Sequence, residues 1–154
     1  MGKKTVDVRA VSTASPEAIM ALLTDGASWP SWSGHDRFEL NEPAPEGAPG
    51  GQEGLGAVRT FHRGRVASKE RVVELIPARK LSYELISGLP LAGYHADVEL
   101  TPQPDGGTEI HWSSSFTPKR PGTGWLYARA LTIFIKRAAT NLAAKAAAEP
   151  APTG

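Results

Sequence analysis

Apolar and polar residues alternate with a period of two between residues 94 and 116. One face of this segment carries Tyr94, Ala96, Val98 and Leu100, and then Ile110, Trp112, Ser114 and Phe116. The sequence Asp105-Gly106-Gly107 between these two runs is typical of a hairpin turn. Alternation over this length predicts an antiparallel sheet with one buried and one exposed face. The large rings on the buried face then need another element to cover them.

Strand-like runs also fill much of the chain before this hairpin. They cover residues 5–12, 35–41, 55–63, 65–76 and the run between breaks at 76–78 and 87–90. The first break contains Pro77, which cannot donate a hydrogen bond to a sheet. Residues 42–54 are rich in proline and glycine, so we expect a flexible, exposed loop at a sheet edge.

Helical segments complete the pattern. Ser15 is a suitable cap, and Pro16 a suitable first residue, for a helix that ends near residue 25. Trp29 and Trp32 are three residues apart, which suits a short helix or turn with both rings on one side. Residues 124–147 consist mainly of helix-forming residues and predict one long helix.

This order of elements predicts an α+β fold. We expect a curved antiparallel sheet of about six or seven strands, wrapped around the C-terminal helix, with two short helices after the first strand. A chain of 154 residues is long enough for one domain with a sizeable core. We expect that domain to span residues 1–148 and to be followed by a disordered tail at 149–154.

Composition excludes several classes of function. The formal net charge is +1, so there is no electrostatic case for binding nucleic acid or an anionic membrane. The absence of cysteine excludes disulfides, thiolate metal sites and cysteine nucleophiles. No segment is long and apolar enough for membrane insertion, and the first residues lack the apolar run of a signal peptide. We therefore expect a cytoplasmic protein.

The four histidines do not have the spacing of metal ligands. His62, His95 and His111 fall on the polar faces of their strands, and no Ser-His-Asp set can be assembled around them. We expect no metal and no cofactor.

Arg59 is the most informative charged residue. If the apolar face of the run at 55–63 points inward, its guanidinium is buried and needs a partner. One interpretation is that Arg59 anchors a carboxylate, phenolate or keto oxygen of a ligand. The other is a structural ion pair with Glu70 on the neighbouring strand. The sequence leaves both open.

Glu70 and Tyr83 are the remaining candidates for catalysis beside Arg59. A carboxyl group in an apolar pocket has a raised pKa and can act as an acid or a base. Glu70 can equally neutralise Arg59 or face water. The aromatic residues are either ordinary core or the wall of a site, and these two roles are compatible. The candidate ligand-binding residues are Trp29, Trp32, Arg59, Phe61, Tyr83, Tyr94, Trp112, Ser114, Phe116 and Phe134.

Short motifs in a fixed order resemble a known superfamily. They are Trp29-x-x-Trp32 after a helix, Gly54-x-Gly56-x-x-Arg59, Glu70-x-Val72, Pro77-x-x-x-Leu81-x-Tyr83 and Gly106-Gly107-Thr108-x-Ile110-x-Trp112, followed by a final helix. Together they resemble the START-like superfamily (SRPBCC), with the helix-grip fold of Bet v 1-like proteins. Within it they most resemble the bacterial polyketide cyclase/dehydrase-like branch. The resemblance spans nearly the whole chain.

The resemblance implies a hydrophobic cavity between the sheet and the C-terminal helix. Members bind lipids, sterols, polyketides or quinones, and some cyclise or aromatise polyketides. We therefore expect a START-like domain that binds a small hydrophobic or aromatic, lipid- or polyketide-like molecule as a carrier or sensor. The alternative is a polyketide cyclase or aromatase that uses Arg59 with pocket tyrosine or glutamate residues. A third possibility is an interaction module that uses the loop at 42–54.

Overall fold

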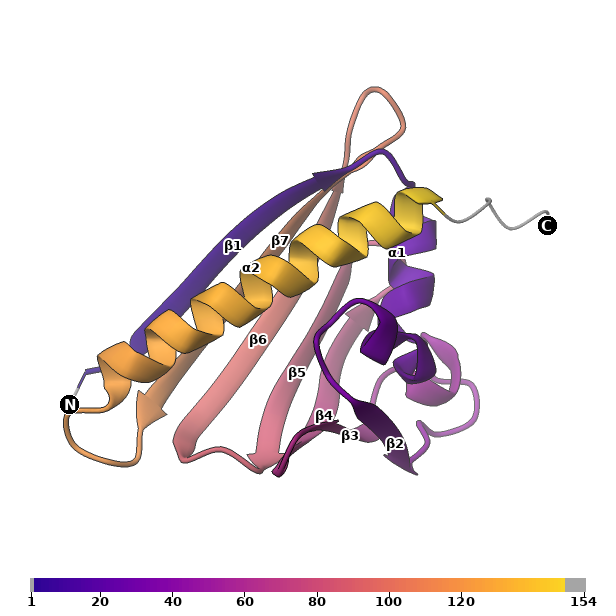
Figure 1. The fold of residues 1–154 in the computed structure, drawn as a ribbon. Coiled ribbons are helices and arrows are strands. Elements are labelled where there is room, and N and C mark those ends of the chain that lie inside the picture. The colour runs from indigo at the N-terminus through magenta and orange to yellow at the C-terminus, as the bar shows by residue number, and fades with distance from the viewer. Residues whose placement is uncertain (1, 149–154) are drawn as a thin grey trace.

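Residues 2–148 are described by a computed structural model, and within them a seven-stranded antiparallel sheet curves around one long helix (Figure 1). The strands are β1 (Lys4–Ser12), β2 (Arg37–Glu42), β3 (Val58–Arg63), β4 (Val66–Ile76), β5 (Lys80–Ser87), β6 (Leu91–Pro102) and β7 (Thr108–Pro118). The helices are α1 (Pro16–Leu23), α2 (Gly124–Ala148) and the short 3₁₀ helices η1 (Gly26–Ser31) and η2 (Gly51–Glu53). The predicted α+β helix-grip architecture is confirmed. The predicted tail at 149–154 lies outside the described residues.

The strand order is β1-β7-β6-β5-β4-β3-β2. Strands that follow one another in the sequence from β2 to β7 are therefore neighbours in the sheet, and the first strand, β1, pairs with the last, β7. In the β6–β7 hairpin Val98 lies opposite Trp112, and Val8 of β1 lies opposite Trp112 from the other side. All three side chains are buried. The period-two alternation therefore identifies the buried face of this part of the sheet correctly.

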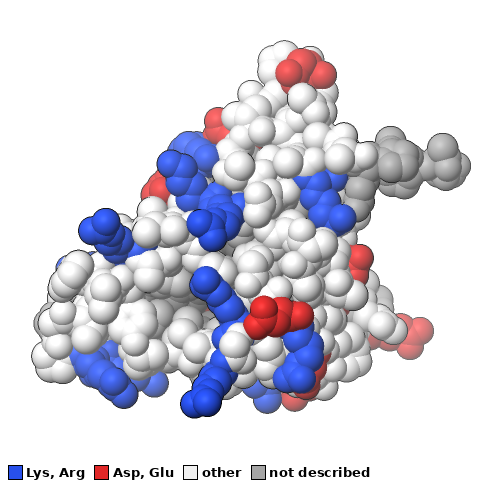
Figure 2. Space-filling model, in the orientation of Figure 1, with Lys and Arg blue, Asp and Glu red and all other residues white. Residues whose placement is uncertain are grey.

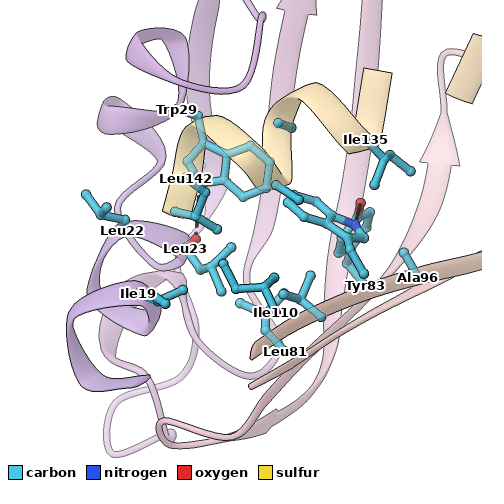
Figure 3. Packing of buried hydrophobic residues seen from close by; sticks show 14 of the residues in the cluster. Ile19, Leu22, Leu23, Trp29, Leu81, Tyr83, Ala96, Ile110, Ile135 and Leu142 are labelled. Atoms are coloured by element: carbon cyan, nitrogen blue, oxygen red, sulfur yellow. Dashed lines mark hydrogen bonds between the residues drawn. The ribbon is translucent and has the colours of Figure 1, made fainter. Parts of the chain in front are cut away.

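The helix α1 begins as the sequence predicts. The Ser15 side chain accepts a hydrogen bond from the Ala18 backbone N–H at 3.2 Å, and Pro16 is the first helical residue. Ile19 and Leu23 are fully buried and pack into the core between the sheet and α2 (Figure 3). As a result α1 and η1 fill one end of the concave face of the sheet.

The two halves of α2 differ in side-chain size. The C-terminal half buries mainly alanine, including Ala138, Ala139 and Ala143, and small side chains let a helix lie close to its neighbours. Ser12 of β1 donates a hydrogen bond to the Ala143 carbonyl at 2.7 Å, which ties this half to the sheet edge. The N-terminal half carries larger residues towards the sheet, among them Phe134. None of the described helices is long and apolar enough to cross a membrane.

The segment at 42–54 is mostly exposed and follows the edge strand β2, as expected, but its end is folded against the rest of the protein. It contains η2, and Glu53 accepts a hydrogen bond from the Gly26 backbone N–H at 2.7 Å. A Cβ atom on Gly54 would lie 2.0 Å from the Pro49 carbonyl oxygen, so the close turn here requires glycine. This end of the segment is thus folded against η1, and β3 begins at Val58, later than predicted.

Candidate functional site

A cavity of about 240 Å³ opens on the concave face of the sheet, beneath the N-terminal half of α2. Its wall is largely apolar and aromatic, with a few polar groups. The lining residues are Trp29, Ser33, His35, Arg63, Val66, Ser68, Glu70, Tyr83, Leu85, Leu89, Tyr94, Trp112, Tyr127, Ala130, Leu131, Phe134, Ile135 and Ala138. Apolar cavities with a few convergent polar groups are typical of sites for small molecules.

A hydrogen bond and ring packing on the core side fix the position of the aromatic wall. Trp29 donates a hydrogen bond from Nε1 to the Leu23 carbonyl at 3.2 Å, at the end of α1. Its ring packs against Trp32 with a centroid distance of 4.6 Å and meets Trp112 edge-on at 6.0 Å. Trp32 is not among the lining residues and supports the wall from the core side. Figure 3 shows Trp29 and Tyr83 in the core between the sheet and α2.

Glu70 is the one carboxyl group in the wall. It comes from β4, and its Oε1 atom is buried without a hydrogen-bond partner among the described residues. Burial raises the pKa of Glu70 to about 8, and the positive charge of Arg59 offsets only part of that effect. Near neutral pH the side chain is therefore mainly the uncharged acid, which can both donate and accept a hydrogen bond.

Two tyrosines lie near Glu70. Tyr83 accepts a hydrogen bond from Trp112 Nε1 at 3.2 Å, and its ring centroid is 6.3 Å from that of Tyr94. Burial raises the pKa of Tyr83 well above its ordinary value and that of Tyr94 to about 12. Both hydroxyls are therefore neutral donors. The Ser114 hydroxyl is buried near Tyr94 without a well-formed hydrogen bond, and Ser114 does not line the cavity.

A second set of polar side chains lies at the other end of the cavity. The Arg63 guanidinium lies over the Phe134 ring, 4.9 Å from its centroid, and the His35 ring meets the same phenyl ring edge-on at 5.0 Å. His35 Nδ1 is 2.7 Å from the Ser33 hydroxyl. Burial, assisted by the charge of Arg63, lowers the pKa of His35 to about 4. The imidazole is therefore neutral near pH 7.

Arg59 does not form the ion pair with Glu70 that one sequence-based interpretation predicted, and its Nε and Nη2 atoms are buried without a partner among the described residues. Its Nη1 donates to the Leu23 carbonyl at 2.7 Å and forms an ion pair with Glu53 at 3.4 Å, rather than with Glu70. The guanidinium also lies over the Trp29 and Phe61 rings. It is fully buried but does not line the cavity, because α1 and η1 fill the concave face at this point. The carbonyl at the C-terminal end of α1 is a favourable partner for a cation.

The predicted site residues divide into two groups. Trp29, Tyr83, Tyr94, Trp112 and Phe134 line the cavity with Glu70, whereas Trp32, Arg59, Phe61, Ser114 and Phe116 lie outside its wall. The polar lining residues that sequence reasoning missed are Ser33, His35, Arg63, Ser68 and Tyr127. Arg63 was detectable, because it follows Phe61 by two residues in the same strand and so shares its face. His35 lies before β2 in an irregular segment, where no period indicates its direction.

The polar groups of the cavity can bind or move a proton. Glu70 can exchange a proton with a bound molecule, and Tyr83 and Tyr94 can donate hydrogen bonds to an oxygen near it. Within residues 2–148 no cluster of histidine and carboxylate side chains is arranged to hold a metal ion.

Several solved structures share this fold. The aromatase/cyclase ZhuI from Streptomyces sp. R1128 aligns with a TM-score of 0.79 and 12% identity, and 94% of each chain is covered. A START superfamily protein from Mycobacterium smegmatis aligns with a TM-score of 0.77 and 14% identity over 94% of this chain and 97% of that one. The protein XoxI from Bacillus cereus gives a TM-score of 0.70 and 17% identity over 94% and 95% of the two chains. At these identities the likeness shows the fold alone.

A comparison with curated proteins finds no match. A protein family, described as polyketide cyclase / dehydrase and lipid transport, matches residues 3–147. That match covers nearly the whole chain and agrees with the START-like fold and with the cavity beneath α2. The chain therefore belongs to the polyketide cyclase / dehydrase and lipid transport family, and its fold is START-like.

Proposed function

We propose that the protein binds a small hydrophobic or aromatic molecule in this cavity, with Glu70 as its hydrogen-bonding anchor. The observation that carries the proposal is the buried Glu70 Oε1 atom, which has no partner among the described residues. A buried polar atom without a partner costs free energy, and a ligand atom that bonds to it removes that cost. The aromatic wall supplies flat apolar surface for the rest of the ligand.

The size of the cavity restricts the ligand. Its volume of about 240 Å³ is slightly below the usual range of roughly 300–1,000 Å³ for small-molecule sites. This favours a molecule of two or three rings, or a short aliphatic chain, over a sterol. The ligand's polar atom lies near Glu70 and Tyr94, and its apolar part lies against Trp29 and Leu131.

The test uses a fluorescent probe, N-phenyl-1-naphthylamine, which is neutral and brightens in apolar surroundings. Ala130 lines the cavity and is also exposed, so Ala130→Trp obstructs the cavity with little effect on the core. Ala148→Trp adds the same side chain at an exposed position at the far end of α2. We expect wild type and Ala148→Trp to bind the probe and Ala130→Trp to lose binding. Equal binding by all three, or binding by none, contradicts the proposal.

Native mass spectrometry of freshly purified wild type and Ala130→Trp then addresses the natural ligand. A small molecule that is carried by wild type and absent from the obstructed variant identifies the ligand class directly.

The enzymatic alternative is favoured by one observation, the Glu70 carboxyl with a pKa of about 8 beside two phenols. In an intramolecular aldol condensation, ionised Glu70 takes a proton from a methylene group between two carbonyls. Tyr83 or Tyr94 donates a hydrogen bond to the resulting enolate oxygen while the enolate carbon attacks a second carbonyl of the same molecule. The alkoxide that forms takes the proton back from Glu70. Glu70 then removes the second methylene proton, and the new hydroxyl group takes up that proton and leaves as water. Arg59 does not reach the cavity and has no direct part in this step.

This alternative makes its own kinetic prediction. Turnover of a poly-β-ketone should rise as the pH passes through about 8, since only ionised Glu70 acts as the base. A Gln amide can still donate and accept a hydrogen bond but cannot act as the base, so Glu70→Gln should retain probe binding and lower turnover at least about a hundredfold. Unchanged turnover in Glu70→Gln would exclude the mechanism and leave the binding proposal intact.

A further inference from the structure

We propose that the ligand carries an anionic group, such as a carboxylate, sulfonate or phosphate, which Arg63 binds at the mouth of the cavity. This inference rests on the proposed function, because it concerns the ligand of the same cavity. The inference adds that the ligand is negatively charged and states where that charge lies in the cavity. The anionic end lies at Arg63, and the opposite end lies near Glu70.

The first argument is the state of the Arg63 side chain. It is exposed at the end of β3, lines the cavity and lies over the Phe134 ring. Among residues 2–148 no carboxylate lies within 4.0 Å of its guanidinium. The phenyl ring holds one face of the planar group, so the N–H groups at its edge remain available for two parallel hydrogen bonds to an anion.

The second argument is the charge of the whole wall. Arg63, Glu70 and His35 are the lining residues whose side chains can carry a charge at ordinary pH. The buried acid and the imidazole are both neutral near pH 7, as their surroundings dictate. Asp36 lies near this end, but it accepts the Gly64 backbone N–H at 2.6 Å and does not pair with Arg63. The lining side chains of the cavity therefore carry one net positive charge, located at the mouth.

The contrast with Arg59 strengthens the assignment. That guanidinium is paired with Glu53 and the Leu23 carbonyl through Nη1 only, and its Nε and Nη2 atoms are buried without a hydrogen-bond partner among the described residues. Arg59 lies outside the cavity wall, so a ligand in the cavity does not contact it, whereas Arg63 lines the wall. On the face that carries α2, lysine and arginine side chains are prominent, which favours the approach of an anion (Figure 2).

The strand register gives the spacing of the two ends. Arg63 pairs with Val66 of β4, and Glu70 is four residues further along the same strand. At about 3.3 Å per residue, the two ends are separated by roughly 13 Å of strand. The ligand is thus an elongated amphiphile with an anion at one end, an apolar or aromatic body, and a hydrogen-bonding atom at the other.

The test compares two probes that differ in one charged group. 8-Anilinonaphthalene-1-sulfonate is N-phenyl-1-naphthylamine with an added sulfonate. We expect wild type to bind the sulfonate probe more tightly than the neutral one. Arg63→Gln should weaken the binding of the sulfonate probe about tenfold and should change the affinity for the neutral probe by less than about twofold. Arg65→Gln is the matched control, since Arg65 is exposed, two residues away and not part of the wall.

Each other outcome overturns the inference in a distinct way. Equal losses for both probes in Arg63→Gln show a structural effect and no anion contact. Equal losses of the sulfonate probe in Arg63→Gln and Arg65→Gln show general attraction by surface charge. If neither probe binds to wild type, the proposed function fails and the inference fails with it. If the neutral probe binds in the cavity and Arg63→Gln changes neither affinity, only the anion assignment is wrong.

Discussion

Arg59 and Glu70 are direct partners in the register of β3 and β4, yet the guanidinium does not bond to the carboxyl group. Arg59 instead contacts the end of α1 and Glu53, on the side of the sheet where α1 and η1 pack. The nearby positive charge lowers the pKa of Glu70 by less than burial raises it. The consequence is a neutral acid in the cavity and a compensated cation beside it.

The buried acid should make stability depend on pH. Above about pH 4.5 Glu70 ionises in the unfolded chain but remains protonated in the folded protein up to about pH 8. The folded state then holds one more proton, so stability falls as the pH rises through this window. Glu70→Gln removes the titration. Between pH 4.5 and pH 8 the free energy of unfolding of the variant should rise by on the order of 3 kcal/mol relative to that of wild type.

Urea unfolding of both proteins at pH 4.5 and pH 8 measures this change. A difference in the free energy of unfolding between wild type and Glu70→Gln that stays constant with pH would show that folding does not raise the pKa of Glu70. Ligand-free protein is required, because a bound molecule that prefers one protonation state shifts the result.

Loss of the Glu53 carboxylate should destabilise the protein. It compensates the buried Arg59 guanidinium and accepts the Gly26 backbone N–H. Removing one partner of a buried ion pair leaves an uncompensated charge. Glu53→Ala should lower the free energy of unfolding by about 2–3 kcal/mol, measured by urea unfolding at pH 7. Glu46→Ala, an exposed position in the same segment, is the control and should have almost no effect.

His35 should contribute a second pH dependence of opposite sign. Its folded pKa of about 4 lies below the value of 6.5 for an unperturbed histidine. As the pH falls from 6.5 to 4, the unfolded chain gains a proton that the folded protein does not, and stability declines. Asparagine does not titrate and can still share a hydrogen bond with the Ser33 hydroxyl, because its amide both donates and accepts. When the pH is lowered from 7 to 4.5, the free energy of unfolding of His35→Asn should fall by about 2 kcal/mol less than that of wild type.

Thermal or urea unfolding at the two pH values checks the His35 prediction. Identical losses in wild type and variant would mean that the imidazole protonates normally in the folded state. His62→Asn provides a comparison, since that histidine lies on an outer strand surface beside Glu39.

The fold was predictable because its signals are local and repeated. The Ser15 cap, the alternation that places Val98 and Trp112 on one face, and the turn at Asp105 each indicate one element, and they agree with one another. The long helix follows from composition alone.

The site was less predictable because its decisive contacts join distant parts of the chain. All residues from Val58 to Phe61 are buried, so alternation does not reveal what each side chain meets. Glu53 belongs to a segment whose proline and glycine content predicts an exposed loop, and only its contacts with Gly26 and Arg59 show that this end of the segment is folded against η1 and β3. Whether Arg59 reaches the cavity depended on the packing of α1, which no local pattern encodes.

The unequal halves of α2 separate two properties of the protein along one helix. The alanine-rich half, fastened to β1 at Ser12, behaves as an anchor whose tolerance to larger residues should be low. The half that carries Leu131 and Phe134 covers the cavity, and larger side chains at these positions leave less volume for a ligand. Ligand preference can therefore diverge among related chains by substitutions in a few turns of helix, with the rest of the scaffold unchanged.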